Sequence, residues 1–160
     1  MKPRSLALLV VLLMATACRP ADGGRVETRP TAAALALLRD WDHRRSRAWT
    51  EGDAEELAGL YTPGSRSGRH DRAMLEAYTA KGLRVTGLEM QVLDASLRSW
   101  TPGRITLEVT DRATGAHAVG PMVRIRLPRD CPSTRVISLR RVADAWRVDE
   151  VRPVPPPARR

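Results

Sequence analysis

The spacing of apolar residues in the first half of the chain predicts three helices. From about Ala32 to Trp49 the apolar residues fall on one helical stripe, which consists of Ala34, Leu37, Leu38, Trp41, Ala48 and Trp49. Gly52 ends this helix, and Asp53 with Glu56 forms a capping-box pattern that starts a short second one. A third helix is predicted from about Asp71 to Lys81, after an arginine-rich loop.

From Leu83 onward the period of the pattern changes to two, which predicts antiparallel strands. The first strand region covers residues 83–100, and its apolar phase shifts near Gly87 and at Val92-Leu93, which indicates bulges. Turns are expected at Thr114-Gly115 and at Ala143-Asp144. Further strands are predicted over residues 105–110, 119–127 (bent at Gly120-Pro121), 135–142 and 145–151.

Residues 1–17 have the pattern of an export signal. Lys2 and Arg4 precede an apolar run over residues 6–17 that is too short to span a bilayer. The segment LLMATAC resembles the lipobox of bacterial lipoproteins, so we expect Cys18 to carry a lipid that anchors the protein to the outer face of the cell membrane. Ordinary secretory cleavage after Ala17 is the alternative, and it would give a secreted protein.

Composition limits the rest of the chain to one domain. The 160 residues are 42% apolar, which suits a single core over residues 32–152, preceded by a flexible tether over residues 18–31 and followed by a Pro-rich tail over residues 153–160. Of the 27 basic residues 25 are arginine, spread along the whole chain, which indicates high-GC bacterial coding rather than a nucleic-acid partner. After signal cleavage the net charge of +7 would favour anionic lipid or cell-wall polymers.

The two cysteines support neither a zinc site nor a redox pair. Lipidation would use Cys18, and Cys131 lies in a turn-rich stretch without a CxxC or HxxxH partner. We therefore predict no metal and no cofactor. If Cys18 is not lipidated, a disulfide between the two cysteines is the rival arrangement.

Arg45 is a charged residue inside the apolar stripe of the first helix. A guanidinium in such a place must meet an anion or reach water, because an unpaired buried charge is costly. Asp42 lies three residues earlier, at the separation of a side-chain pair, so a structural Asp42–Arg45 pair is the simpler interpretation. The alternative is that Arg45 meets an anionic ligand in a cavity.

Three segments resemble the nuclear transport factor 2-like superfamily, whose small bacterial members are called SnoaL-like. They are AWTEGDAEELAGLYTPGS, the third helix and RVISLRRVADAWRVDEVR, so the resemblance covers about Ala32 to Arg152. It implies an α+β, cone-shaped fold in which three N-terminal helices pack on a curved antiparallel sheet and enclose a pocket. Some members are ketosteroid isomerases, scytalone dehydratases or polyketide cyclases, and many are binding or assembly modules.

The resemblance also suggests which side chains would face the pocket. The expected lining consists of Trp41, Arg45, Trp49, Tyr61 and Tyr78. Weak candidates for acid–base chemistry are Asp42 or Asp94 as a base beside Tyr61 or Tyr78. Isomerase-like members place a carboxylate in the loop after the second helix, where this chain has Thr62-Pro63-Gly64-Ser65, which counts against isomerisation. Solvent-facing positions are the simpler explanation for Glu89 and His117.

These observations favour binding over catalysis. We expect an exported, lipid-anchored domain that binds a small amphipathic ligand or a cell-envelope protein without performing chemistry. One alternative is a pocket enzyme of the cyclase, isomerase or dehydratase type. Another is an assembly module that docks through its sheet face. The sequence leaves the oligomeric state open, with a dimer among the options.

Overall fold

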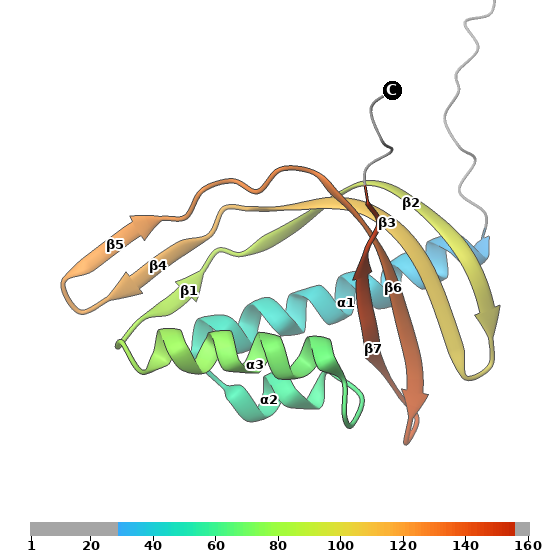
Figure 1. The fold of residues 1–160 in the computed structure, drawn as a ribbon, viewed down its shortest axis with the longest axis horizontal. Coiled ribbons are helices and arrows are strands. Elements are labelled where there is room, and N and C mark those ends of the chain that lie inside the picture. The colour runs from blue at the N-terminus through green and yellow to red at the C-terminus, as the bar shows by residue number, and fades with distance from the viewer. Residues whose placement is uncertain (1–28, 156–160) are drawn as a thin grey trace, which may run out of the picture.

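The computed structural model describes residues 29–155, which form three helices followed by seven strands (Figure 1). The helices are α1 (Arg29–Glu51), α2 (Ala54–Gly59) and α3 (Arg66–Thr79). The strands are β1 (Arg84–Thr86), β2 (Glu89–Thr101), β3 (Arg104–Thr114), β4 (His117–Gly120), β5 (Val123–Arg126), β6 (Ser133–Val142) and β7 (Ala145–Pro153).

All strand pairs are antiparallel, and they make two sheets that follow one curve. The larger sheet has the order β2-β3-β6-β7, and the smaller one has the order β1-β4-β5. The three helices lie together on one side of the curved sheets, beneath them in the view of Figure 1. The predicted fold class is therefore confirmed: helices come first, and a curved antiparallel sheet covers them.

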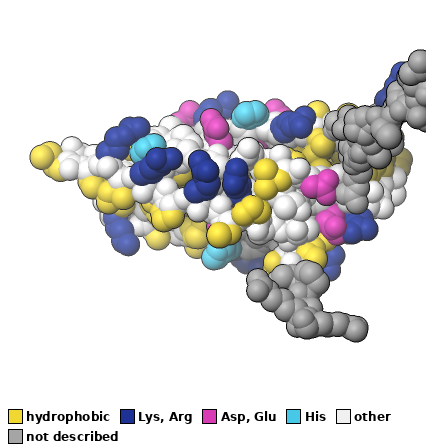
Figure 2. All heavy atoms as spheres, turned by 90° about the horizontal axis from the view of Figure 1, so that it is seen from above, with side chains coloured by type: hydrophobic (Ala, Val, Ile, Leu, Met, Phe, Trp, Pro, Cys, Tyr) yellow, Lys and Arg dark blue, Asp and Glu magenta, His cyan; other side chains and the backbone are white. Residues whose placement is uncertain are grey.

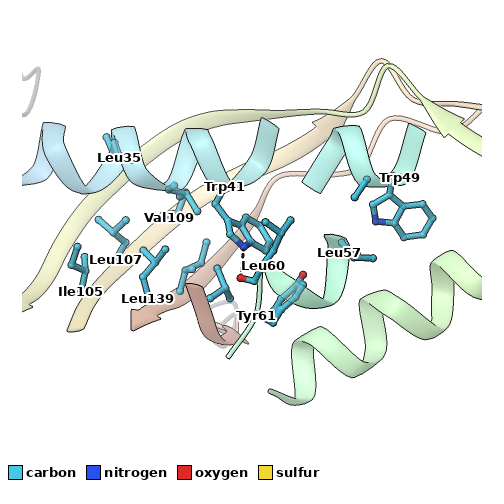
Figure 3. Packing of buried hydrophobic residues seen from close by; sticks show 14 of the residues in the cluster. Leu35, Trp41, Trp49, Leu57, Leu60, Tyr61, Ile105, Leu107, Val109 and Leu139 are labelled. Carbon is cyan, nitrogen blue, oxygen red and sulfur yellow. Dashed lines mark hydrogen bonds between the residues drawn. The ribbon is translucent and has the colours of Figure 1, made fainter. Parts of the chain in front are cut away.

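The core lies between the apolar stripe of α1 and the inner face of the larger sheet (Figure 3). Leu38 and Trp41 face the sheet from α1, and β3 turns Ile105, Leu107 and Val109 inward, each of them fully buried. The indole Nε1 of Trp41 donates a hydrogen bond to the Leu60 carbonyl oxygen at 2.9 Å. This bond ties α1 to the end of α2 inside the core, where an unpaired indole N–H would be costly.

The largest differences from the predicted helix boundaries are the starts of α1 and α3. Helix α1 begins at Arg29, so residues 29–31 of the expected tether form its first turn. Helix α3 begins at Arg66 and not at Asp71, because the Ser65 hydroxyl accepts from the Gly68 N–H and caps the helix early. The prediction of an arginine-rich loop was therefore wrong, since its arginines lie on helix α3.

The N-cap of α2 is confirmed, but the reciprocal half of the capping box is not seen. The Asp53 side chain accepts from the N–H groups of Glu55 and Glu56 at 3.0 and 2.9 Å. The Glu56 carboxylate instead accepts from Arg44 at 3.1 Å, which ties α2 to α1. A salt bridge to a neighbouring helix thus replaces the local contact that the sequence pattern predicts.

The predicted irregularities of the first strand region are confirmed. The chain bends between β1 and β2 at Gly87, whose φ is 68°, and the β2–β3 register shifts between Val92 and Asp94. A second shift, between Leu97 and Ser99, was not predicted. These features let β2 curve over α1.

Two features of the strand region differ from the prediction. The expected turn at Thr114-Gly115 is a bend at which β3 passes into β4, and Gly115 has a φ of 73°. The expected single strand over residues 119–127 is a hairpin of β4 and β5 that reverses after Gly120. The tight turn at Ala143-Asp144 is confirmed, with φ of 47° and 64° at its two residues.

The predictions for the export signal, for Cys18 and for most of the tether and tail lie outside the described residues. Within residues 29–155, no helix is long and apolar enough to cross a membrane.

Candidate functional site

Arg45 is paired with Asp71 of α3 and not with Asp42. Its Nε and Nη2 atoms donate to the two carboxylate oxygens of Asp71 at 2.7 and 2.6 Å. The guanidinium also lies 6.0 and 5.9 Å from the ring centres of Trp41 and Trp49. The expected Asp42–Arg45 pair was therefore wrong, because α3 supplies a carboxylate with two-point geometry that a neighbour on the same helix does not match.

Asp71 is the centre of a fully satisfied buried network. Besides the two bonds from Arg45, its carboxylate accepts from the Tyr61 hydroxyl at 2.8 Å and from Trp49 Nε1 at 3.3 Å. Burial followed by the Asp71 charge raises the pKa of Tyr61 above its ordinary value. Burial alone would lower the pKa of Arg45, but Asp71 outweighs it and raises that pKa. This network joins α1 and α3 to the segment that follows α2.

Two adjoining cavities lie beside this network and form one cleft. The first has a volume of about 260 Å³ and the second about 350 Å³, and Arg45, Met74, Met90 and Arg135 line both. The second is mainly apolar, with walls that include Trp49, Tyr78, Val85, Leu88, Ala113 and Leu127. The first adds the ionisable residues Asp42, His70 and Asp71, and Asp130 lines the second. The cleft is thus amphipathic: the second cavity forms its apolar end and the first cavity forms its polar end.

Asp42 is the carboxyl group of the cleft whose chemistry is most altered. Burial raises the pKa of Asp42 to about 7, while the charges of Arg45 and Arg135 lower it and that of Asp111 raises it. Within residues 29–155, no hydrogen bond or ion pair engages the Asp42 carboxylate. A carboxyl group of this kind exchanges a proton near neutral pH and still has its bonding capacity available for a ligand.

A second buried carboxylate, Asp111, lies close enough to Asp42 to influence its pKa. Asp111 is 2% exposed, and one of its oxygens accepts from Nη2 of Arg135, which lines both cavities. The other oxygen, Oδ1, has no hydrogen-bond partner among the described residues. Arg135 is thus paired with Asp111 through Nη2 alone, and its Nε atom is buried without a hydrogen-bond partner among the described residues, whereas Arg45 bonds Asp71 through two nitrogens.

The sequence reasoning missed Asp111 and the role of Asp71, although a signal existed for each. The alternation that turns Ile105, Leu107 and Val109 inward continues to Asp111, which places a carboxylate on the inner face of β3. Asp71 falls on the apolar face of α3 together with Leu75, at helical spacing. Both residues are recognised by the same pattern: a carboxylate at a position where the period of the strand or helix places a core residue.

The structure brings most of the other predicted pocket residues to the cleft. Trp41 and Tyr61 line the first cavity, with their rings edge to face at 5.3 Å. Trp49 and Tyr78 line the second in the same arrangement at 5.7 Å. Asp94 does not join them, because it is exposed on β2 beside the bulge.

The remaining candidates lie outside the two cavities. Glu89 is exposed at the start of β2, and His117 contacts the Gly115 carbonyl oxygen through Nδ1 at 2.9 Å. Cys131 is an exposed free thiol. Among residues 29–155, no three His, Cys, Asp or Glu side chains gather in a way that could hold a metal ion.

Neither a protein-family model nor a curated protein sequence matches this chain. Solved structures do. A proposed dehydratase of the NTF2-like family from Streptomyces avermitilis has 16% identity and a TM-score of 0.50, over 78% of this chain and 99% of that one. The intermembrane space region of chloroplast protein ARC6 has 15% identity and a TM-score of 0.52, over 78% and 96%.

A proposed aromatic ring hydroxylase from Novosphingobium aromaticivorans is similar to the same degree. It has 10% identity and a TM-score of 0.50, over 78% of this chain and 92% of that one. At such identities the likeness concerns the fold and not the activity. The chain therefore has the nuclear transport factor 2-like fold that its sequence resembles.

Proposed function

We propose that the cleft binds a small amphipathic molecule. The observation that supports this most is the arrangement of the two cavities: an apolar space of about 350 Å³ adjoins one of about 260 Å³ that holds a carboxyl group without a partner among the described residues. Apolar walls with a few placed polar groups are typical of small-molecule sites. The apolar part of the ligand would lie against Met74, Tyr78 and Met90.

The polar end of the ligand should carry a hydrogen-bond donor or a positive charge. Both arginines of the cleft already have carboxylate partners, Arg45 in Asp71 and Arg135 in Asp111. Asp42 has none within residues 29–155, and one oxygen of Asp111 is also without a bond. An amine or hydroxyl would bond the Asp42 carboxylate, which lines the first cavity, whereas the ionised form of Asp42 would repel a carboxylate.

Titration with decylamine and with decanoate tests this preference. Decylamine should bind at least about tenfold more tightly, since one charge-assisted hydrogen bond is worth about 1.5–3 kcal/mol. Its affinity should rise as the pH passes through 7, because Asp42 then ionises. The Asp42→Asn variant should lose both the preference and the pH dependence. Equal binding of the two compounds would contradict the proposed polarity of the cleft.

A pocket enzyme is the second candidate, and the pKa of Asp42 favours it. A carboxyl group that titrates at about 7 within an apolar cleft has the property required of a general base. Two structures of the same fold carry enzyme names, the proposed dehydratase and the proposed hydroxylase. Tyr61 is held by Asp71, so Asp42 would work without it. Turnover of an apolar carbonyl compound that disappears in Asp42→Asn would favour catalysis over binding alone.

We also propose that the protein is exported and anchored through a lipid on Cys18. This rests on the charged N-terminus, the short apolar run and the LLMATAC segment. The Cys18→Ser variant should leave the membrane fraction of the producing cell, while Cys131→Ser should stay in it. Membrane retention of Cys18→Ser equal to that of the wild type would contradict the anchor.

A further inference from the structure

The geometry points to a second site, a pocket of about 220 Å³ at the N-terminal end of α3 that binds a phosphate group. The pocket is lined by three arginines from two elements, Arg69 and Arg72 of α3 and Arg147 of β7. Thr62 and Ser65 also line it, with the Thr62 hydroxyl donating to Asp149 at 2.7 Å and the Ser65 hydroxyl accepting from the Gly68 N–H. No Asp or Glu of residues 29–155 is part of its lining. The cleft uses none of these arginines.

Arg147 is the end of a row of arginines that crosses three strands. In the strand register Arg104 lies opposite Arg140, and Arg140 lies opposite Arg147. Like charges placed opposite each other destabilise a sheet unless they are compensated. Asp149 accepts a hydrogen bond from Arg104 at 2.9 Å and forms a salt bridge with Arg140 at 3.3 Å, which compensates those two charges.

Arg147 receives no such compensation. Among the described residues it has no acidic partner, and its Nε atom is buried without a hydrogen bond. Buried polar atoms without a protein partner call for water or an ion. Because Arg147 borders the pocket, an anion placed there would lie beside a guanidinium that has no acidic partner among the described residues.

Helix α3 adds positive potential to the same pocket. Arg69 has no acidic partner among the described residues and donates to the Gly64 carbonyl oxygen at 2.7 Å. Arg72 is partly neutralised by Glu76 at 2.8 Å and Glu55 at 3.4 Å. The N-terminal end of a helix also carries a partial positive charge. Two uncompensated guanidinium groups and a helix end therefore face one small space.

The chemistry of this space fits a tetrahedral oxyanion. Guanidinium groups bind phosphate through paired N–H donors, and three arginines offer more donors than a carboxylate can use. The phosphate could belong to a soluble phosphate compound or to the headgroup of an anionic lipid. Both sources present the same oxygens to Arg69 and Arg147.

Calorimetric titration of inorganic phosphate into the full chain tests the site. Saturable binding is expected, and Arg147→Gln and Arg69→Gln should each weaken it by about tenfold or more, because each removes a charge-assisted bond. Figure 2 shows that basic side chains also gather on the outer face of the sheet, so the control must match the change in net charge. Arg124→Gln, an exposed arginine of β5, provides that control.

Unchanged phosphate affinity in Arg124→Gln supports the site. If Arg124→Gln loses as much phosphate affinity as Arg147→Gln and Arg69→Gln, the binding reflects general charge attraction and the proposal is overturned. Absence of saturable binding by the wild type overturns it directly. If Arg147→Gln does not fold, Arg69→Gln decides the question. Vesicles of phosphatidylglycerol distinguish the two sources: retention that Arg147→Gln abolishes and Arg124→Gln preserves identifies a lipid headgroup, and phosphate binding without vesicle retention identifies a soluble phosphate.

Discussion

Replacing Asp71 with asparagine is expected to lower the free energy of unfolding by about 3 kcal/mol, because the change leaves the Arg45 guanidinium without its anionic partner. Asp71 is 4% exposed and accepts four hydrogen bonds, so an amide in its place would also oppose one N–H group to the surrounding donors. Urea denaturation of the two proteins measures the difference. A loss below about 1 kcal/mol would mean that the network contributes little.

The matched control is an exposed carboxylate of the same helix. Glu76 pairs with Arg72 at 2.8 Å in an exposed contact, and Glu76→Gln should change the stability by less than about 1 kcal/mol. A double variant separates the pair from its neighbours. Arg45→Met combined with Asp71→Asn should recover part of the loss, because no unpaired charge is then left buried. Strict additivity of the two single effects would contradict a direct coupling.

The Asp42→Asn variant is expected to be more stable than the wild type above about pH 7, by about 2–3 kcal/mol after allowance for the partial exposure of the group. The pKa of Asp42 rises from 3.8 to about 7 on folding, so the folded protein holds this proton more tightly than the unfolded chain. The stabilisation from the proton is complete below about pH 4. It is lost as the pH rises to about 7, because the ionised carboxylate is then buried at a cost.

Asparagine does not ionise, so the variant should lack this pH dependence. The measurement is the difference in unfolding free energy between wild type and variant by urea denaturation at about pH 5 and about pH 8. The difference should grow in favour of the variant between these two values. Other titrating groups cancel in the comparison because both proteins contain them. A variant that is less stable than the wild type at the higher pH would show that Asp42 makes a favourable contact there.

A group that destabilises its own fold is typical of a functional site. Buried carboxylates without partners are costly, and a protein that serves only to fold could replace Asp42 by an apolar residue at no loss. Asp71 shows the contrast on the facing helix, since it is as close to the cleft but fully bonded. The two residues differ in what surrounds them and not in chemical type. This contrast is the reason for assigning the ligand to Asp42.

The sequence predicted correctly those features that depend on residues close together in the chain. The stripe of α1, the Asp53 cap, the bulge at Val92 and the turn at Ala143-Asp144 follow from neighbouring residues, and the structure confirms them. The start of α3 was misplaced because arginines and glycine resemble a loop, whereas the Ser65 cap decides the boundary.

The partner of Arg45 could not be read from the sequence. Asp42 is three residues away and Asp71 twenty-six, and only the packing of α3 against α1 brings the second carboxylate within reach. The same holds for the influence of Asp111 on Asp42, which links the sheet to a helix. Period-two alternation predicted the inner face of β3, but not which residue of α1 it would face. A pocket is lined by residues that lie far apart in the sequence. The residues that line the pocket were therefore predicted better than the hydrogen bonds and ion pairs between them.

The fold alone does not decide the function. Structures at 10–16% identity share the architecture of this chain, and their names range from a proposed dehydratase to a region of a chloroplast protein. The assignment rests instead on the amphipathic cleft and on the state of its carboxyl groups. Occupation of the cleft by a ligand is therefore the point that matters most.

The most direct measurement is the calorimetric titration of decylamine into the wild type, Ala113→Phe and Ala77→Phe. Ala113 lines the apolar cavity of about 350 Å³, so a phenyl ring there should fill the space and abolish binding. Ala77 is exposed on α3, and the same ring there should leave the affinity unchanged. Saturable binding that only Ala113→Phe removes is the predicted result. Binding that survives in Ala113→Phe, or no saturable binding by the wild type, would contradict the proposal that this cleft holds the ligand.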